Sequence, residues 1–169
     1  MRAHQPGSGV RGKRAIELIN SLDMISETSL VLGLPDDTPE TIQATFDLAV
    51  HYDPDLAFFL TIAPWPYSDI YADREPYSES HDYEDYNLVA PVVKPKAMTR
   101  DELMEEIIDC YRRFYMGKLK KVPFMTKTKR DYFTVTMKLL MENSYLRQFM
   151  GGLGKMPAEV DELVTRFGQ

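Results

Sequence analysis

The chain has 169 residues, enough for one domain of ordinary size, and its 44% hydrophobic and 27% charged residues allow a packed core. A net charge of −6 argues against a general nucleic-acid-binding protein, and no apolar run is long enough to span a membrane. The single cysteine, Cys110, excludes a disulfide framework and a cysteine-based zinc site, so we expect a protein of the reducing cytoplasm.

Residues 1–12 contain several glycines and no apolar period, which predicts a flexible lead-in. Apolar residues then recur at helical spacing, and they predict a helix over 13–22 with the apolar stripe Ala15, Leu18, Ile19 and Leu22. The run Leu30–Leu32 predicts a strand over 29–33. Its apolar residues are consecutive rather than alternating, a pattern typical of a strand that is buried on both faces in a parallel sheet.

Gly33 ends this strand and opens the stretch around which we expect the chain to be organised. A turn over 35–37 leads to a helix start, with Thr38 as the N-cap and Pro39 as the first helical residue. After that helix, the apolar run 56–62 predicts a second strand. A strand, a helix and a strand so close together form a βαβ unit with parallel strands and a right-handed crossover. Ligands bind outside the carboxyl ends of such strands, where the Gly33 turn lies.

Local chemistry leaves the role of this turn open. The segment 33–38 is either a ligand-facing turn or an ordinary turn in which glycine supplies a positive φ. Asp36 and Asp37 have two possible roles. They bind a cation or act in acid–base chemistry, or they are simply carboxylates that the dipole at the start of a helix favours. The histidines of the chain have no cysteine or histidine partners at ligand spacing, so the sequence does not support a metal site.

Trp65 and Tyr67 follow the second strand in a proline-rich loop. They either line a substrate pocket or pack beneath the segment that follows. Residues 69–86 contain seven acidic residues against one basic residue, and four tyrosines lie among them: Tyr71, Tyr77, Tyr83 and Tyr86. We expect residues 73–98 to form an acidic, irregular linker to a helical part of the chain.

Two longer helices are predicted after this linker. A capping box at Thr99 and Glu102 starts the first, which ends near Gly117 and has the apolar face Leu103, Ile107, Cys110, Tyr111 and Phe114. Cys110 is therefore expected to be a core residue. A second capping box at Thr128 starts a helix with the apolar positions Val135, Leu139, Leu146 and Phe149. The glycines at 151–154 end it, and a short helix is predicted after Pro157.

Three motifs resemble the second half of the catalytic barrel of radical S-adenosylmethionine enzymes: Leu32-Gly-Leu-Pro-Asp-Asp-Thr-Pro-Glu-Thr41, Asp53-Pro-Asp-Leu-Ala-Phe-Phe59 and Pro64-Trp-Pro-Tyr-Ser-Asp-Ile-Tyr71. Within this family they are similar to the cobalamin-binding-domain branch, which includes the anaerobic magnesium-protoporphyrin IX monomethyl ester cyclases. The resemblance implies an α/β fold: the C-terminal part of a partial (β/α)6 barrel over 1–72, the linker over 73–98, and an α-helical C-terminal extension over 99–169.

The same resemblance implies site residues at the ends of the two strands. Leu32, Gly33 and Leu34 would lie beside the adenosyl part of S-adenosylmethionine, and Leu60, Thr61 and Ile62 would offer backbone groups to its adenine. Asp37 stands where the family usually has glutamate, and Asp36 where it has glycine. Trp65 and Tyr67 would belong to the substrate pocket, although Tyr67 and Ser68 replace the usual Gly-Thr.

The family's three cluster cysteines are missing from this chain. S-adenosylmethionine, a 4Fe-4S cluster and cobalamin are therefore implied for a full-length enzyme, and none of them is assigned to this chain alone. The full enzyme would cleave S-adenosylmethionine reductively and start radical chemistry on a small molecule such as a tetrapyrrole. We expect this chain to be inactive alone and to need the missing N-terminal barrel half, from the same gene or a separate chain. The alternatives are a non-catalytic docking module that completes a barrel with a partner, and a gene fragment.

Overall fold

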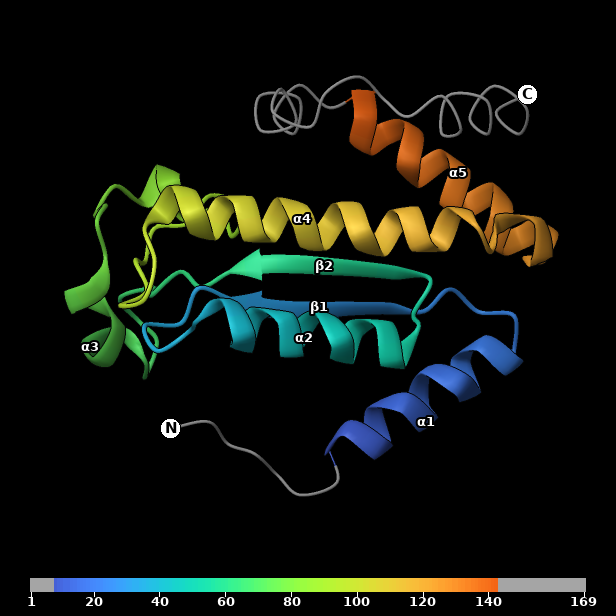
Figure 1. Ribbon diagram of the computed structural model, residues 1–169, viewed down its shortest axis with the longest axis horizontal. Coiled ribbons are helices and arrows are strands. Elements are labelled where there is room, and N and C mark those ends of the chain that lie inside the picture. Colours follow the sequence, from blue (N-terminus) through green and yellow to red (C-terminus); the bar gives the residue numbers. More distant parts are fainter. Residues whose placement is uncertain (1–7, 143–169) are drawn as a thin grey trace.

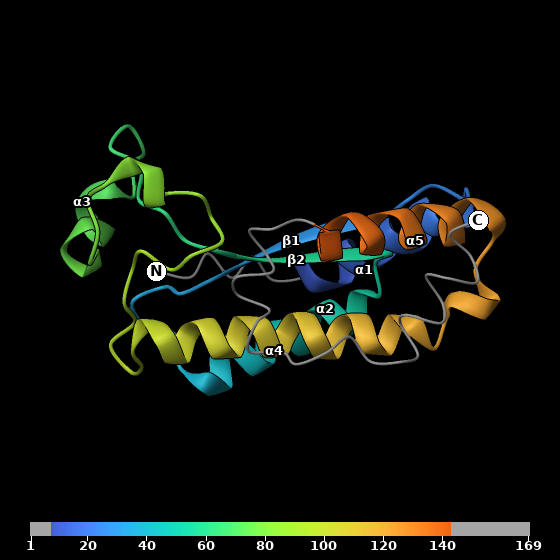
Figure 2. The same ribbon diagram turned by 90° about the horizontal axis from the view of Figure 1, so that it is seen from above.

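Two parallel strands form the centre of the computed structural model, which describes residues 8–142. Strand β1 (Glu27–Leu32) pairs with β2 (Leu56–Thr61), so that Glu27 lies opposite Leu56 and Leu32 opposite Thr61. Helix α2 (Pro39–Tyr52) connects the strands, and α2 and α4 (Arg100–Leu119) lie on the same side of the sheet (Figures 1 and 2). The predicted βαβ unit and its parallel pairing are confirmed.

The other elements surround this unit. Helix α1 (Ser8–Ser21) packs against α2, and α5 (Lys127–Glu142) follows α4 after the 3₁₀ turn η3 (Val122–Phe124). Three short elements lie beyond the carboxyl ends of the strands (Figure 1): α3 (Tyr71–Arg74), η1 (Glu75–Tyr77) and η2 (Tyr83–Asp85). Among residues 8–142, no helix combines the length and apolar character that crossing a membrane requires.

Two of the three predicted helix starts at a threonine cap, those at Thr38 and Thr99, are confirmed. The Thr38 hydroxyl accepts a hydrogen bond from the Thr41 N–H, and the Thr41 hydroxyl accepts one from the Thr38 N–H. Thr99 and Glu102 exchange the same pair of bonds at the start of α4. Each box satisfies amides that a helix start leaves without partners, which defines where α2 and α4 begin.

The main core lies between the sheet and the two helices α2 and α4. Phe59 of β2 is at its centre: its ring stacks on Phe46 of α2 and meets Tyr111 and Phe114 of α4 edge to face. Such aromatic pairs add stabilisation beyond the area that they bury. Cys110 is buried in the same cluster, so its predicted role as a core residue is confirmed.

The prediction that β1 is buried on both faces is wrong. Leu30 and Leu32 point into the core, but Val31 between them is 52% exposed. The opposite face is covered only near the start of the strands, where Phe133 and Met137 of α5 pack with Leu56 of β2. Consecutive apolar residues therefore did not indicate two covered faces, because the described chain places helices fully over only one of them.

Two helix starts also differ from the prediction. Helix α1 begins at Ser8, inside the expected lead-in, and it buries Ile16, whereas Leu18 and Leu22 of the predicted stripe are 62% and 63% exposed. Gly12 allows the close approach to α2, since a Cβ there would lie 2.7 Å from the Tyr52 ring.

Helix α5 begins at Lys127, and the threonine that caps it is Thr126 and not the predicted Thr128, since the Thr126 hydroxyl accepts a hydrogen bond from the Lys129 N–H. Val135, a predicted apolar position, is 56% exposed. The Leu139 side chain, Leu146, Phe149, the glycines at 151–154 and the helix after Pro157 lie outside what the structure describes.

The outer edge of β2 is closed by groups that are not strands. The Tyr115 hydroxyl accepts from the Ala57 N–H and donates to the Ala57 carbonyl, and the Tyr111 hydroxyl accepts from the Phe59 N–H. The Thr61 N–H donates to the Leu88 carbonyl at 2.9 Å. Alternate amides along this edge are therefore satisfied, and no further strand can pair there without displacing α4.

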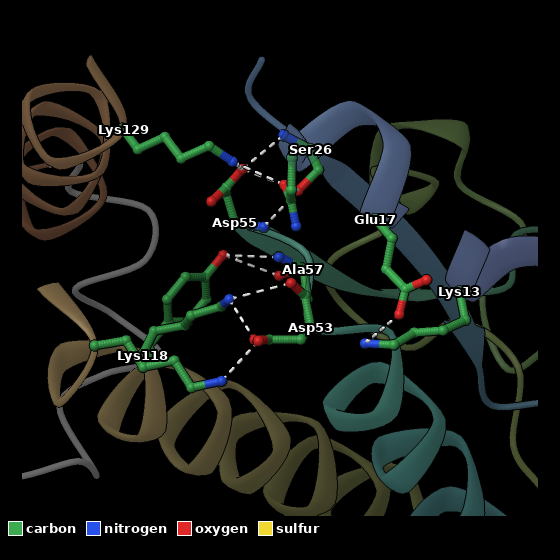
Figure 3. Close-up of polar contacts among 11 residues, drawn as sticks. Lys13, Glu17, Ser26, Asp53, Asp55, Ala57, Lys118 and Lys129 are labelled. Carbon is green, nitrogen blue, oxygen red and sulfur yellow. Dashed lines mark hydrogen bonds and ion pairs between the residues drawn. The ribbon is translucent and has the colours of Figure 1, made fainter. Parts of the chain in front are cut away.

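Two lysine–aspartate networks hold the start of the strands to α4 and α5 (Figure 3). Lys129 of α5 donates to Asp55 at 2.6 Å, and the same carboxylate accepts from the backbone and hydroxyl of Ser26, just before β1. Asp53, at the end of α2, accepts from Lys118 and Lys121. Polar contacts thus fix the helical extension at the end of the sheet that is remote from the predicted site.

We predict that Lys129→Met lowers the free energy of unfolding by about 3–5 kcal/mol, because it leaves Asp55 as an uncompensated buried carboxylate. The two side chains are 9% and 11% exposed. Urea unfolding followed by circular dichroism measures the loss. The control is Lys127→Met, whose ion pair with Asp131 is on the surface; we expect a change within about 0.5 kcal/mol. Equal effects of the two substitutions would contradict the prediction.

We also predict a loss of stability in acid that depends on Asp53. Burial acts to raise the pKa of Asp53, but the hydrogen bonds and charges of Lys118 and Lys121 outweigh it and lower the pKa. A carboxyl whose pKa is lower in the folded chain stabilises the fold above its unfolded pKa, about 3.9, and loses this contribution as pH falls through the folded pKa. Unfolding at a series of acidic pH values should therefore show a shallower decline for Asp53→Asn. The exposed control Glu105→Gln should decline like the unchanged chain.

Candidate functional site

The Gly33 turn joins the carboxyl end of β1 to α2, and its backbone requires glycine. Gly33 has a φ of +82°, and a Cβ at this position would lie 2.9 Å from Cδ2 of Leu103 in α4. An L-residue would be strained by the dihedral angle and would also push against the core. The turn is therefore pressed against α4, and Leu103 fills the space beside Gly33.

Asp37 braces this turn from inside. Its side chain is buried, and its carboxylate accepts hydrogen bonds from the Leu34 N–H and from the Thr41 hydroxyl, both at 2.9 Å. Its own N–H donates to the Leu34 carbonyl. These bonds hold the loop and the first turn of α2 together, so the described contacts of Asp37 are with the protein's own backbone and cap.

Asp36, in contrast, points to solvent and pairs with Lys96 at 2.7 Å. The hydrogen bond from Lys96 lowers the pKa of Asp36, and the bond to Asp36 raises the pKa of Lys96. The Lys96 ammonium also lies over the Tyr77 ring, and the Lys96 N–H donates to the Pro35 carbonyl. The segment after η2 is thereby tied to the Gly33 turn.

The predicted cofactor residues come together at one end of the sheet, but most of them are covered. The Ile62 N–H donates to the Leu32 carbonyl, so the two strand ends lie side by side. Leu34 and Leu60 are half-buried. The other five are buried: Leu32, Gly33, Asp37, Thr61 and Ile62. Because the N–H groups of Thr61 and Ile62 already donate to protein carbonyls, these two residues could offer a ligand only their carbonyl oxygens.

Trp65 and Tyr67, the predicted pocket residues, belong to an aromatic group that the sequence did not reveal. The Trp65 ring stacks on Tyr67 and on Tyr83, and Tyr86 meets both Trp65 and Tyr83 edge to face. Leu34 of the Gly33 turn packs with Trp65 against the same buried cluster as Tyr86. The sequence showed tyrosines spaced through the acidic stretch, and that spacing was the only signal for this group.

A hollow of about 480 Å³ lies elsewhere, between the start of α4 and the segment before it. Its lining includes Glu79, Lys94, Arg100 and Met104 and none of the predicted cofactor residues. Lys94 and Arg100 already form ion pairs with Glu79. We therefore place the candidate site at the strand ends and not in this hollow.

The residues present do not fit a 4Fe-4S cluster. In the family that the sequence resembles, three cysteine thiolates hold such a cluster, whereas this chain has one cysteine. Burial in the α4 core raises the pKa of Cys110 to about 12, so its thiol stays protonated and enclosed. Within residues 8–142, no group of three histidine, cysteine or acidic side chains is placed to hold a metal ion.

The chain is similar to two proteins named anaerobic magnesium-protoporphyrin IX monomethyl ester cyclase. The protein of Rubrivivax gelatinosus is 35% identical over 141 residues, and that of Cereibacter sphaeroides is 37% identical over 145 residues. These matches cover 82% and 85% of this chain but only 25% and 24% of the relatives. The chain thus spans about a quarter of the length of the curated relatives it matches.

A more distant relative is an uncharacterized methyltransferase of Pyrococcus horikoshii, which is 25% identical over 115 residues. That match covers 65% of this chain and 25% of the methyltransferase. No family model and no solved structure matches the chain.

We predict that Gly33→Ala destabilises the fold by about 1–3 kcal/mol, because alanine resists the positive φ and its Cβ would contact Leu103. Gly117→Ala is the matched control. Gly117 lies within α4 with open space around a Cβ, so the same substitution should stabilise the protein by about 0.5–1 kcal/mol. Urea unfolding of the two variants tests the difference in sign, and a stabilising Gly33→Ala would contradict our account of the turn.

Proposed function

We propose that this chain, a homologue of the anaerobic magnesium-protoporphyrin IX monomethyl ester cyclases, supplies the last two strands of a radical S-adenosylmethionine barrel and the helical extension behind them. The remaining strands and the cluster would come from a partner, on the same or another polypeptide. The assembled enzyme would act on a tetrapyrrole by oxidative cyclisation. The observation that carries this proposal is the difference between the two edges of the sheet.

Of the two strands that the structure describes, only β1 has an edge to which another strand can be added. Two hydrogen bonds show which backbone groups of β1 face β2. The Leu56 N–H donates to the Ser26 carbonyl and the Ile62 N–H to the Leu32 carbonyl, so every second residue from Ser26 to Leu32 faces β2. The groups of Ser29 and Val31, between them, therefore face the other edge, where the described chain places no strand. Since two strands alone are marginal as a sheet, this edge favours a partner strand.

Helix α1 indicates the direction of that strand. Both α1 and α2 run opposite to the strands (Figure 1), as crossover helices of parallel sheets do. Because α2 connects β2 to its neighbour β1, α1 has the position of a crossover from a preceding strand beside β1. A partner that supplies this strand would also cover the exposed apolar side chains of Leu18, Leu22 and Met24.

S-adenosylmethionine would lie at the carboxyl ends of the strands, where the half-buried Leu34 and Leu60 can contact an adenosyl group. When bound and reduced in a complete enzyme, it supplies the radical that starts the reaction. This chain's own part is to position: the Gly33 turn and Asp37 hold the wall of the site in place. The cluster has to be held by cysteines outside this chain.

The alternative function, a docking module without catalysis, uses the same free edge. The two functions use the same surface to form a complex, and they differ in whether that complex is catalytically active. The partner, the cofactors and the activity are all properties of an assembly larger than this chain, so the test has to build that assembly.

The test combines this chain with the Rubrivivax gelatinosus cyclase from which the matching segment has been deleted. Under anaerobic conditions we expect the two to co-purify, the complex to contain iron and sulfide, and a reductant to release 5′-deoxyadenosine from S-adenosylmethionine. This chain alone should contain no stoichiometric cluster. A complex that cleaves no S-adenosylmethionine would favour the docking module, and the absence of any complex would overturn both readings.

Leu18→Glu tests the docking face within the same assay. We expect it to weaken co-purification at least about tenfold, since burying a leucine stabilises by about 1.5–3 kcal/mol. The matched control is Val135→Glu, which places the same charge on an exposed apolar position of α5. Weaker co-purification of Leu18→Glu than of Val135→Glu supports the proposed face, and equal co-purification of the two variants contradicts it.

A further inference from the structure

Trp65 is the middle ring of an aromatic ladder that also contains Tyr67 and Tyr83. The Trp65 and Tyr67 ring centroids are 6.0 Å apart with planes 16° from parallel, and those of Trp65 and Tyr83 are 6.4 Å apart at 28°. Among the described ring contacts none joins Tyr67 to Tyr83, which places Trp65 between them. The three rings form one stack, and its two outer faces belong to Tyr67 and Tyr83.

The ladder is held by its surroundings. Tyr86 is buried, and its ring meets Trp65 and Tyr83 edge to face, each at 5.3 Å between centroids. The Trp65 carbonyl accepts hydrogen bonds from the N–H and the hydroxyl of Ser68, which closes a tight turn. With prolines on both sides of Trp65, little backbone freedom remains there, so the middle ring is set in place before any ligand arrives.

The outer rings are exposed although they are large and flat. Tyr67 is 85% exposed and Tyr83 is 54% exposed, and both lie at the carboxyl end of the sheet, beyond the Gly33 turn. An aromatic surface that stays open beside the ligand end of a parallel sheet is suited to stacking on a planar ligand.

We propose that the ladder of Tyr67, Trp65 and Tyr83 is the stacking platform for the face of a metallated tetrapyrrole ester. This inference rests on the proposed function, since the relatives' printed name supplies the substrate class. The macrocycle is flat and conjugated, so it can extend the stack by lying on the outer face of Tyr67 or of Tyr83. The binding energy comes from ring stacking and burial, and the inference concerns binding and not the radical step.

The charges near the ladder favour an ester over a free acid. Asp82, Glu84 and Asp85 are exposed next to Tyr83, and residues 81–86 contain no lysine or arginine. Anionic side chains repel the carboxylates of a porphyrin diacid, and a monomethyl ester has one carboxylate fewer. We therefore expect the platform to bind the monomethyl ester more tightly than the corresponding diacid, with the difference reduced by salt.

Trp65 provides a direct readout, because it is the only tryptophan of the chain. The full chain is titrated with magnesium-protoporphyrin IX monomethyl ester while tryptophan emission is recorded. We expect saturable quenching that weakens about 2- to 10-fold in Tyr67→Ala and in Tyr83→Ala. Tyr67→Phe keeps the ring and should bind like the unchanged chain. The control Tyr132→Ala removes an exposed tyrosine of α5 that has no part in the ladder, and it should change nothing.

Several outcomes would overturn the inference: no saturable quenching, quenching that is unaffected by Tyr67→Ala and Tyr83→Ala, or stronger binding of the diacid than of the ester. Quenching by S-adenosylmethionine in place of the ester would assign the ladder to the adenine and would also overturn it. Circular dichroism establishes that each variant is folded. The titration contains no partner, cluster or reductant, so its failure leaves the co-purification result standing, and a failed co-purification does not affect the titration.

Discussion

The structure depends on how the backbone amides at the outer edge of β2 are satisfied. A buried N–H without a partner costs free energy, and in most sheets the next strand supplies that partner. Here the hydroxyls of Tyr111 and Tyr115 and the carbonyl of Leu88 do so instead. Burial raises the pKa of both tyrosines, which keeps their hydroxyl protons in place for hydrogen bonding. Helix α4 is thereby tied along β2, and growth of the sheet is possible only beside β1.

The two ends of the sheet differ in how their side chains are used. At the start of the strands, Asp53 and Asp55 are neutralised by lysines of the helical extension, and burial of Lys118 lowers its pKa despite the hydrogen bond that it donates to Asp53. At the carboxyl end, the Gly33 turn and the aromatic ladder remain accessible in part. The same division between a stabilising end and a functional end is usual in barrels of parallel strands.

Local patterns in the sequence were sufficient for the βαβ unit and for the starts of α2 and α4, because caps and prolines act over a few residues. They failed where the outcome depends on distant partners. Val31 is apolar but exposed, since no described element covers it, and Leu18 fits a helical stripe whose buried side is set by packing against Tyr52. The aromatic ladder was not predicted for the same reason. Tyr83 contacts Trp65 because of how the irregular segment between them folds back, and local sequence patterns do not reveal that path.

The proposed function separates binding from chemistry. Cys110 is the single thiol of the chain, and the core that needs it as a small apolar group also keeps this thiol protonated. The turn at Gly33 is filled from behind by Leu103, so it supplies a firm wall and no reactive group. What remains exposed at this end is the flat aromatic surface of Tyr67 and Tyr83. In the role that we propose, such a chain would orient a planar substrate against chemistry that another part of the enzyme performs, and rigidity is the property that this role requires.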